Sequence, residues 1–151
     1  QLSFHEKVEK VNQILARVNL AGVNNKYPSE LSGGMKKRVA LARAIVLRPK
    51  YLFCDEPNSG LDPQTAMVID NLIKDVTVEF NITTIVVTHD MNSVMEIGDY
   101  ILYLHQGRKE WEGSNKDIIY SQNELLNKFI FASEFLQDAK AMRMTHNPKT
   151  N

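Results

Sequence analysis

Two adjacent carboxylates, Asp55 and Glu56, follow a continuous apolar run at residues 51–54. Such a run is typical of a strand that is buried on both faces of a parallel sheet, and parallel sheets bind ligands at the carboxyl ends of their strands. At that position Asp55 could hold Mg²⁺ through water, and Glu56 could accept a proton from an attacking water. Two acids after a strand also often form only a solvated turn, so the pair needs support from other residues.

A second candidate site lies upstream, at Ser32, Gly33 and Gly34, where a helical pattern begins. Ser32 is a favourable N-cap residue, and two glycines allow a ligand to approach the main chain closely. The free N–H groups and the positive dipole end of such a helix start bind anions. A plain capped helix is the better explanation of these three residues when they are taken alone.

Two further polar residues follow the acids. Asp62 stands before Pro63, a pair that is typical of an N-cap and the first position of a helix. His89 follows residues 82–88, a run rich in β-branched residues that predicts a second buried strand. A lone histidine is usually structural, so the context of His89 decides its interpretation.

In their order and spacing, these motifs resemble the second half of an ATP-binding cassette (ABC) ATPase domain. Residues 31–35 resemble the signature motif, and residues 51–56 resemble the Walker B strand with its catalytic glutamate. Residues 59–62 are similar to the D-loop, and residues 88–90 resemble the loop of the switch histidine. The resemblance covers most of the chain, to about Tyr120.

The resemblance implies hydrolysis of ATP with Mg²⁺ as the metal ion. Glu56 would be the general base, and His89 would contact the γ-phosphate and position the water. Asp55 would hold Mg²⁺ through water. The residues implied to bind the ATP of a partner subunit are those of the signature and the D-loop: Leu31, Ser32, Gly33, Gly34, Met35 and Asp62.

The implied fold class is α/β: a partial P-loop NTPase (ABC ATPase) domain with parallel strands, flanking helices and a C-terminal β-hairpin. The implied partners are a second nucleotide-binding subunit, in a homodimer or a pair, and a transmembrane permease. The protein would then lie peripherally on the cytoplasmic side of a bacterial inner membrane. Basic and acidic residues are equal in number, 18 of each, which gives no electrostatic drive toward nucleic acid and disfavours an ABC ATPase of DNA maintenance.

One motif of the family is absent from this sequence. A phosphate-binding loop needs the pattern GxxxxGK[ST], and none of the seven glycines opens it. We therefore expect this chain to be inactive alone, and we expect a gap in the sheet between residues 82–88 and 100–104, where the family has its Walker A strand. Exposed strand edges would invite rearrangement, swapping or association. A non-catalytic interaction fragment is the alternative that this absence favours.

The amino-acid sequences of two motifs resemble those in the ATPases of bacterial Mla/Mce-type lipid transporters. Met35 takes the fifth signature position, where glutamine is commonest, and residues 56–63 read EPNSGLDP. Residues 27–30, before the signature, fit the same group. The resemblance implies phospholipid transport, with the ATPase of an ABC system for another substrate as the alternative.

The chain is expected to divide into four segments. Residues 1–50 would complete the helical subdomain with the signature helix, and residues 51–121 would form the C-terminal part of a RecA-like ATPase core. An amphipathic helix at residues 122–138 would pack on its own domain or on a partner subunit. Residues 139–151 are predicted to be a flexible tail.

The basic residues of the signature helix are spread around it. They are Lys36, Lys37, Arg38 and Arg43. This spread favours a solvated face over a phosphate site. Further along, Gln106 and Gly107 predict a hairpin turn between two short strands.

Overall fold

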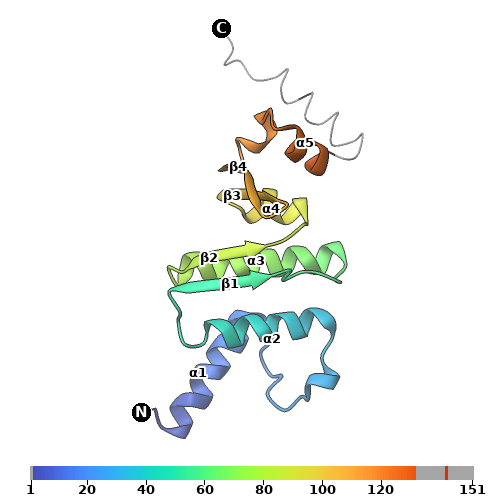
Figure 1. Cartoon of the computed structure of the whole chain (residues 1–151). Coiled ribbons are helices and arrows are strands. Elements are labelled where there is room, and N and C mark those ends of the chain that lie inside the picture. The colour runs from blue at the N-terminus through green and yellow to red at the C-terminus, as the bar shows by residue number, and fades with distance from the viewer. Residues whose placement is uncertain (1, 132–141, 143–151) are drawn as a thin grey trace. The chain divides into compact units, whose positions relative to one another are not determined.

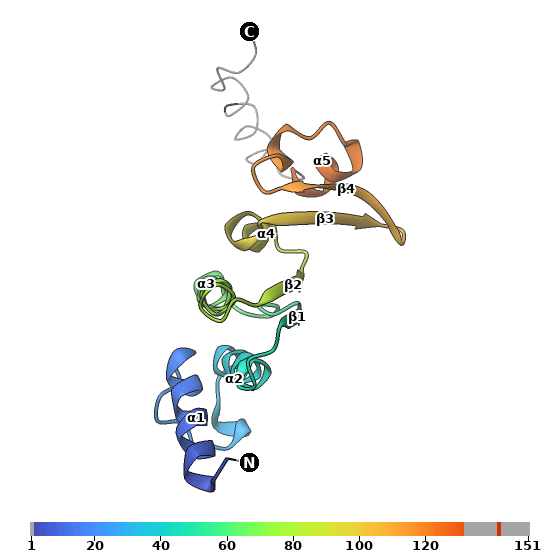
Figure 2. The same cartoon turned by 90° about the vertical axis from the view of Figure 1, so that its left-hand side faces the viewer.

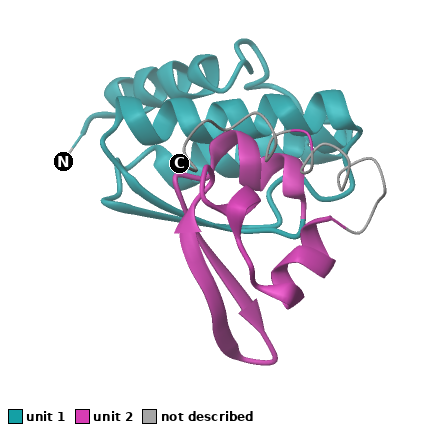
Figure 3. Cartoon of the chain, turned by 90° about the horizontal axis from the view of Figure 1, so that it is seen from above, with its two compact units in different colours: residues 1–89 teal, residues 90–151 magenta. Residues whose placement is uncertain are grey.

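A computed structural model describes residues 2–131 and residue 142 of the chain. The chain forms two compact units, unit 1 at residues 1–89 and unit 2 at residues 90–151 (Figure 3). The segment boundaries predicted after residues 50, 121 and 138 remain predictions.

Unit 1 contains helices and one pair of strands. Its helices are α1 (Phe4–Arg17), the short 3-10 helix η1 (Pro28–Glu30), α2 (Gly33–Ile45) and α3 (Pro63–Glu79). Each α-helix starts after a residue whose side chain accepts a hydrogen bond from the first turn, namely Ser3, Ser32 and Asp62. Such caps satisfy N–H groups that have no partner within the helix, so short-range sequence signals set these starts. α2 contacts both α1 and α3 (Figure 1).

Two parallel strands complete unit 1. β1 (Tyr51–Asp55) and β2 (Thr83–Val87) pair in register, with Leu52 opposite Thr84 and Asp55 opposite Val87. α3 connects the two strands, as a parallel pair requires a crossover of this kind. The carboxyl ends of both strands therefore meet at one edge.

One face of this strand pair is turned toward α3. The hydroxyl oxygens of Thr77 on α3 and Thr84 on β2 are 2.6 Å apart, so the face that carries Thr84 and Leu52 packs on the helix (Figure 2). Leu52 is 4% exposed. The core of unit 1 includes the buried side chains of Val18, Leu20, Ile45, Ile69, Ile73, Val76 and Ile82.

The opposite face of the strand pair carries large apolar side chains that are open to solvent. Tyr51 is 63% exposed, Phe53 is 72% exposed and Val87 is 58% exposed. The prediction that residues 51–54 are buried on both faces is therefore wrong for this chain. The reason is that the helices of unit 1 lie on one side of the pair (Figure 2), and in residues 2–89 no element covers the other side.

Unit 2 contains α4 (Met91–Ile97), β3 (Tyr100–His105), β4 (Arg108–Ser114), the 3-10 helix η2 (Ile118–Tyr120) and α5 (Glu124–Ile130). β3 and β4 pair antiparallel. Gln106 and Gly107 both have positive φ, 48° and 74°, as a two-residue hairpin turn requires. The predicted hairpin turn is thus confirmed.

A small apolar core holds unit 2 together. Ile118, Leu126 and Ile130 are buried and pack against half-buried side chains that include Trp111. The ring of Tyr103 on β3 lies 5.6 Å from the ring of Phe129 on α5. Helix α5 therefore packs on its own unit along this side.

The predicted fold class is confirmed: the chain is α/β, with a parallel pair and an antiparallel hairpin. In the described residues, the two strand pairs form separate two-stranded sheets, and the expected gap after β2 remains a prediction. The predicted helix at residues 122–138 is described only as α5, and its later part and the predicted tail lie outside the described residues, apart from residue 142. Within the described part, no helix is long and apolar enough to cross a membrane.

Candidate functional site

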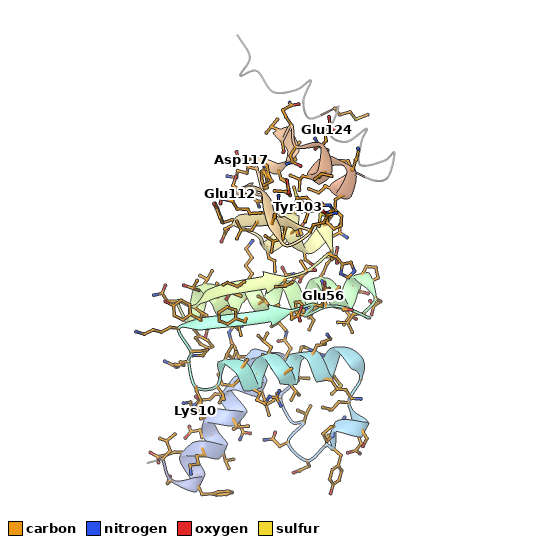
Figure 4. All side chains as sticks on the ribbon, in the orientation of Figure 1. Lys10, Glu56, Tyr103, Glu112, Asp117 and Glu124 are labelled. Atoms are coloured by element: carbon orange, nitrogen blue, oxygen red, sulfur yellow. The ribbon has the colours of Figure 1, made fainter. Side chains whose placement is uncertain are left out.

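Glu56 and His89 meet at the carboxyl end of the parallel strands. Glu56 follows β1 directly and lies at its arrowhead end (Figure 4). Its Oε1 atom is 2.8 Å from Nδ1 of His89 and accepts a hydrogen bond from the main-chain N–H of His89 at 3.2 Å. The imidazole is largely exposed, with 75% of its side-chain surface accessible. Two residues that the sequence singled out separately therefore form one constellation.

The main chain of Glu56 is fixed in an uncommon conformation. Its φ is 45°, in the left-handed region that non-glycine residues seldom adopt. The N–H of Glu56 donates to the carbonyl of Val87 at 2.9 Å, and its carbonyl accepts from Nζ of Lys37 at 3.0 Å. The second carboxylate oxygen, Oε2, is buried and accepts no hydrogen bond from the described residues.

Asp55 takes a different direction from Glu56. It is the last residue of β1, it is exposed, and its position in the register places it on the same face as Phe53. The described residues contain no group of three or more histidine, cysteine or carboxylate side chains that could hold a metal ion. A single exposed carboxylate nevertheless fits Mg²⁺, which keeps several of its waters and takes its other ligands from phosphates.

The residues that resemble the signature motif form the start of α2. Ser32 is the N-cap, and its hydroxyl accepts a hydrogen bond from the N–H of Met35 at 3.2 Å. The first hydrogen bond within the helix runs from Lys36 N–H to the carbonyl of Ser32 at 2.9 Å. The N–H groups of Gly33 and Gly34 precede that bond, so they have no partner within the helix. Together with the helix dipole, they give this start the chemistry of an anion site.

Packing of α2 against α3 leaves no room for a side chain at Gly34. A Cβ at Gly34 would lie 2.6 Å from Cγ2 of Thr65 on α3, whereas a Cβ at Gly33 would meet its nearest side chain, that of Leu61, at 3.5 Å. The start of α2 and the first turn of α3 therefore approach too closely for a side chain at residue 34. This contact joins the start of α2 to α3, the helix that follows residues 59–62.

Asp62 caps α3. Its Oδ1 accepts a hydrogen bond from the N–H of Thr65 at 3.0 Å. The hydroxyl of Thr65, and then its N–H, hold the pKa of the Asp62 carboxyl below its usual value. The side chain is exposed, so the cap leaves Asp62 accessible to a partner.

Two contacts at the site involve residues that sequence reasoning missed. Lys37 was expected on a solvated face, but it is half-buried and bonded to Glu56. Asn58 and Asp70 are both 5% exposed, and Nδ2 of Asn58 lies 3.3 Å from Oδ2 and 3.4 Å from Oδ1 of Asp70. Arg38 also departs from the expected solvated face, since it donates to the carbonyl of Asn19 at 3.0 Å.

The structure thus brings some of the predicted site residues together and leaves others apart. Glu56 and His89 are in contact. Ser32 and Asp62 each cap a helix, and Asp55 lies on the open face of the strand pair. The hydrogen bond of Lys37 connects the helix that Ser32 caps to the loop that Glu56 begins.

Comparisons with known proteins agree with this arrangement. Residues 2–59 match the protein family described as "ABC transporter". The chain is also similar to a solved dimeric ATP-binding cassette, MJ0796, bound to ADP and Pi, with a TM-score of 0.67 and 34% identity over 76% of this chain and 50% of that one. The chain corresponds to the C-terminal part of an ABC transporter ATP-binding domain.

Curated relatives of the chain include proteins named as import ATP-binding proteins. The methionine import ATP-binding protein MetN of Campylobacter jejuni is 41% identical over 137 residues, which are 91% of this chain and 41% of that protein. The sulfate/thiosulfate import ATP-binding protein CysA of Mesostigma viride is 38% identical, over 89% of this chain and 41% of that protein. The chloroplastic protein TRIGALACTOSYLDIACYLGLYCEROL 3 of Arabidopsis thaliana is 38% identical, over 88% of this chain and 43% of that protein.

The chain therefore spans less than half the length of these curated relatives. Several further relatives are also named as methionine import proteins. The predicted relationship to the ATPases of Mla/Mce-type phospholipid transporters is not supported, because the relatives MetN and CysA are named as methionine and sulfate import proteins.

Proposed function

We propose that this chain is part of an ATP-binding subunit that hydrolyses ATP to drive an ABC transporter. The observation that carries the proposal is the contact between Glu56 and His89 at the carboxyl end of a parallel strand pair. A general base beside a polar residue that can hold a water is what phosphoryl transfer to water needs. The family match and the similarity to a solved cassette support the same function.

Glu56 is the general base in this proposal. One carboxylate oxygen, Oε1, is held by both the main chain and the imidazole of His89, which fixes the direction of the carboxylate. The other oxygen, Oε2, accepts no hydrogen bond from the described residues, and we assign the proton of the attacking water to the carboxylate group of Glu56 as a whole. His89 positions that water and contacts the terminal phosphate.

Asp55 would hold Mg²⁺ through water from the open face of β1. ATP with Mg²⁺ supplies the phosphate that is attacked and the positive charge that neutralises it. The sequence of this chain contains no GxxxxGK[ST] loop. The residues that cradle the phosphates must therefore come from outside the 151 residues.

The signature and the D-loop act on the ATP of a second subunit in this proposal. The N–H groups of Gly33 and Gly34 and the hydroxyl of Ser32 would bind the terminal phosphate, with Leu31 and Met35 flanking them and Asp62 close by. The dimeric state of the similar cassette MJ0796 supports an arrangement of two subunits. A transmembrane permease is the further partner, and it would bring this subunit to a membrane surface as a peripheral protein.

The transported substrate is a separate proposal. The relatives named above include import proteins for methionine and for sulfate or thiosulfate, and these favour import of a small solute. Met35 and the sequence EPNSGLDP favoured a lipid, and the relative named after trigalactosyldiacylglycerol, a glycolipid, is similar to the chain at 38% identity. Stimulation of ATP hydrolysis in vesicles that contain the subunit and its permease, with methionine, sulfate or phospholipid as the added substrate, separates these classes.

The first test is equilibrium binding of a non-hydrolysable ATP analogue with Mg²⁺. We expect no binding by these 151 residues and tight binding by a version extended upstream to include a phosphate-binding loop. Tight binding by the short chain would contradict our assignment of the missing phosphate cradle. Absence of binding by both versions would contradict the proposed function.

A further inference from the structure

Lys37 joins the signature helix to the main chain of Glu56. Its Nζ donates a hydrogen bond to the carbonyl oxygen of Glu56 at 3.0 Å, and the contact is half-buried. Lys37 lies in the early part of α2 (Gly33–Ile45), just past the turn that Ser32 caps. The contact therefore reaches from the element assigned to a partner's ATP to the residue assigned as general base.

The conformation of Glu56 explains why such a contact matters. A φ of 45° is sparsely populated for a residue with a side chain, and it persists only when the surrounding structure holds it. The N–H of Glu56 is held by Val87, and its carboxylate is held by His89. Val87 is the last residue of β2, and His89 lies two residues further along the chain.

Lys37, which lies on α2, holds the main chain of Glu56 through its carbonyl oxygen. Its donor is an ammonium group, and hydrogen bonds from charged donors are stronger than those between neutral groups. The bonded carbonyl is that of Glu56 itself, so a displacement of the Lys37 ammonium acts directly on the peptide that sets the direction of the carboxylate. A small displacement of a catalytic group is costly, because roughly 1 Å can reduce a rate about a hundredfold.

The neighbouring lysine provides an internal comparison. Lys36 is exposed, whereas Lys37 is half-buried. The two residues have the same charge and adjacent places on the same helix, but successive residues of a helix point in different directions. Lys36 is therefore a matched control for charge and for helix propensity.

We propose that Lys37 is a positioning residue for Glu56, and that it couples the place of the signature helix to the orientation of the general base. The proposal rests on the function proposed above. Lys37 does not donate or accept a proton in the reaction. Its ammonium holds the left-handed backbone conformation at Glu56. The carboxylate of Glu56 therefore has the orientation that a general base needs only while α2 keeps its place beside Glu56.

Steady-state kinetics of the full-length subunit test this role. We expect Lys37→Met to lower kcat for ATP hydrolysis by about ten- to a hundredfold, with KM for ATP changed less than about twofold because a positioning role gives Lys37 no contact with the nucleotide. Lys37→Arg retains a charged donor and should restore most of kcat, and Lys36→Met should match the wild type. A normal kcat in Lys37→Met, or an equal loss in Lys36→Met, would overturn the proposal.

A second measurement does not depend on ATP hydrolysis. In the 151-residue chain, Lys37→Met should speed hydrogen exchange of the Glu56 amide and shift the ¹⁵N resonance of Nδ1 of His89, whereas Lys36→Met should change neither. Unchanged exchange and resonance in a folded Lys37→Met chain would refute the positioning role even if kcat fell. If the wild-type full-length subunit hydrolyses no ATP, the proposed function fails, and these two measurements still decide the role of Lys37.

Discussion

Oε1 of Glu56 lies 2.8 Å from Nδ1 of His89, across the carboxyl ends of β1 and β2. The parallel register of the two strands brings together residues that are 33 positions apart in sequence. The same oxygen accepts from the main-chain N–H of His89, so one of its two hydrogen bonds is independent of the imidazole. The carboxylate direction is therefore set partly by the backbone of the strand end.

Replacing Glu56 by glutamine should stop hydrolysis and preserve nucleotide binding. Glutamine keeps the length of the side chain and an oxygen that can accept from His89, but it cannot take a proton from water. In the full-length subunit we expect ATP turnover to fall by about 10²–10⁴-fold, with an ATP-bound dimer accumulating in sedimentation experiments. Glu9→Gln, an exposed change on α1, is the control, and near-normal turnover in Glu56→Gln would remove the assigned role.

Much of the fold and part of the site could be predicted because their causes are local. Ser32 and Asp62 act as caps within three residues of themselves, and the turn at Gln106 and Gly107 is set by two adjacent residues. The place of Glu56 after a strand, and of His89 after the next strand, follows from short apolar runs. These signals depend little on which other elements are present.

The remaining features depend on how elements pack, and a sequence pattern does not contain that information. Lys37 and Lys36 are alike in sequence, and the place of Glu56 relative to α2 decides which of them is bonded. Tyr51 and Phe53 have the apolar pattern of a fully buried strand, yet they are exposed because the helices of unit 1 lie on the other face. Burial of such a run depends on a covering element as well as on the run itself.

A methyl group at residue 34 should disturb the contact between α2 and α3. Gly34→Ala would place Cβ 2.6 Å from Cγ2 of Thr65, and the β-branched side chain of Thr65 has little freedom to move away. We expect the free energy of unfolding to fall by about 1–3 kcal/mol, measured by urea titration. Gly33→Ala, where the nearest side-chain atom is 3.5 Å away, serves as the control for stability.

The double variant Gly34→Ala/Thr65→Ser tests the cause of that loss. Serine lacks Cγ2 but keeps the hydroxyl, so the overlap is removed while the group that bonds Asp62 remains. We expect the double variant to regain most of the stability lost in Gly34→Ala. A double variant as unstable as the single one would show that the loss does not arise from this overlap.

Asn58 should stabilise the loop between β1 and α3 through Asp70. Both side chains are 5% exposed, and the amide of Asn58 donates to the carboxyl oxygens of Asp70. Asn58→Ala removes a buried donor, which typically costs about 1–3 kcal/mol. Chemical denaturation followed by circular dichroism measures the loss. Asn71→Ala, an exposed change in α3, should leave stability equal or slightly higher because alanine is the better helix former.

Asp62 should make the stability of the chain fall in acid. Because Thr65 lowers the pKa of Asp62 below its ordinary value of 3.8, the folded state favours the ionised carboxylate more than the unfolded state does. The contribution of Asp62 is therefore complete above the unfolded pKa, and it is lost as the pH falls through the lower pKa of the folded state. Other carboxyls with a lowered pKa, such as Asp117, contribute to the total in the same direction, so a variant is needed to isolate Asp62.

Asp62→Asn isolates this contribution, since asparagine caps a helix about as well as aspartate but does not titrate. We expect the stability advantage of the wild type over Asp62→Asn to be constant at neutral pH and to shrink as the pH falls below about 4. Urea titrations of both proteins from neutral pH into this acid range measure the difference. Asp75→Asn, on the exposed side of α3, reports the loss of a charge without the loss of a cap. An advantage of the wild type that persists unchanged into strong acid would show that the bond from Thr65 does not favour the ionised form of Asp62.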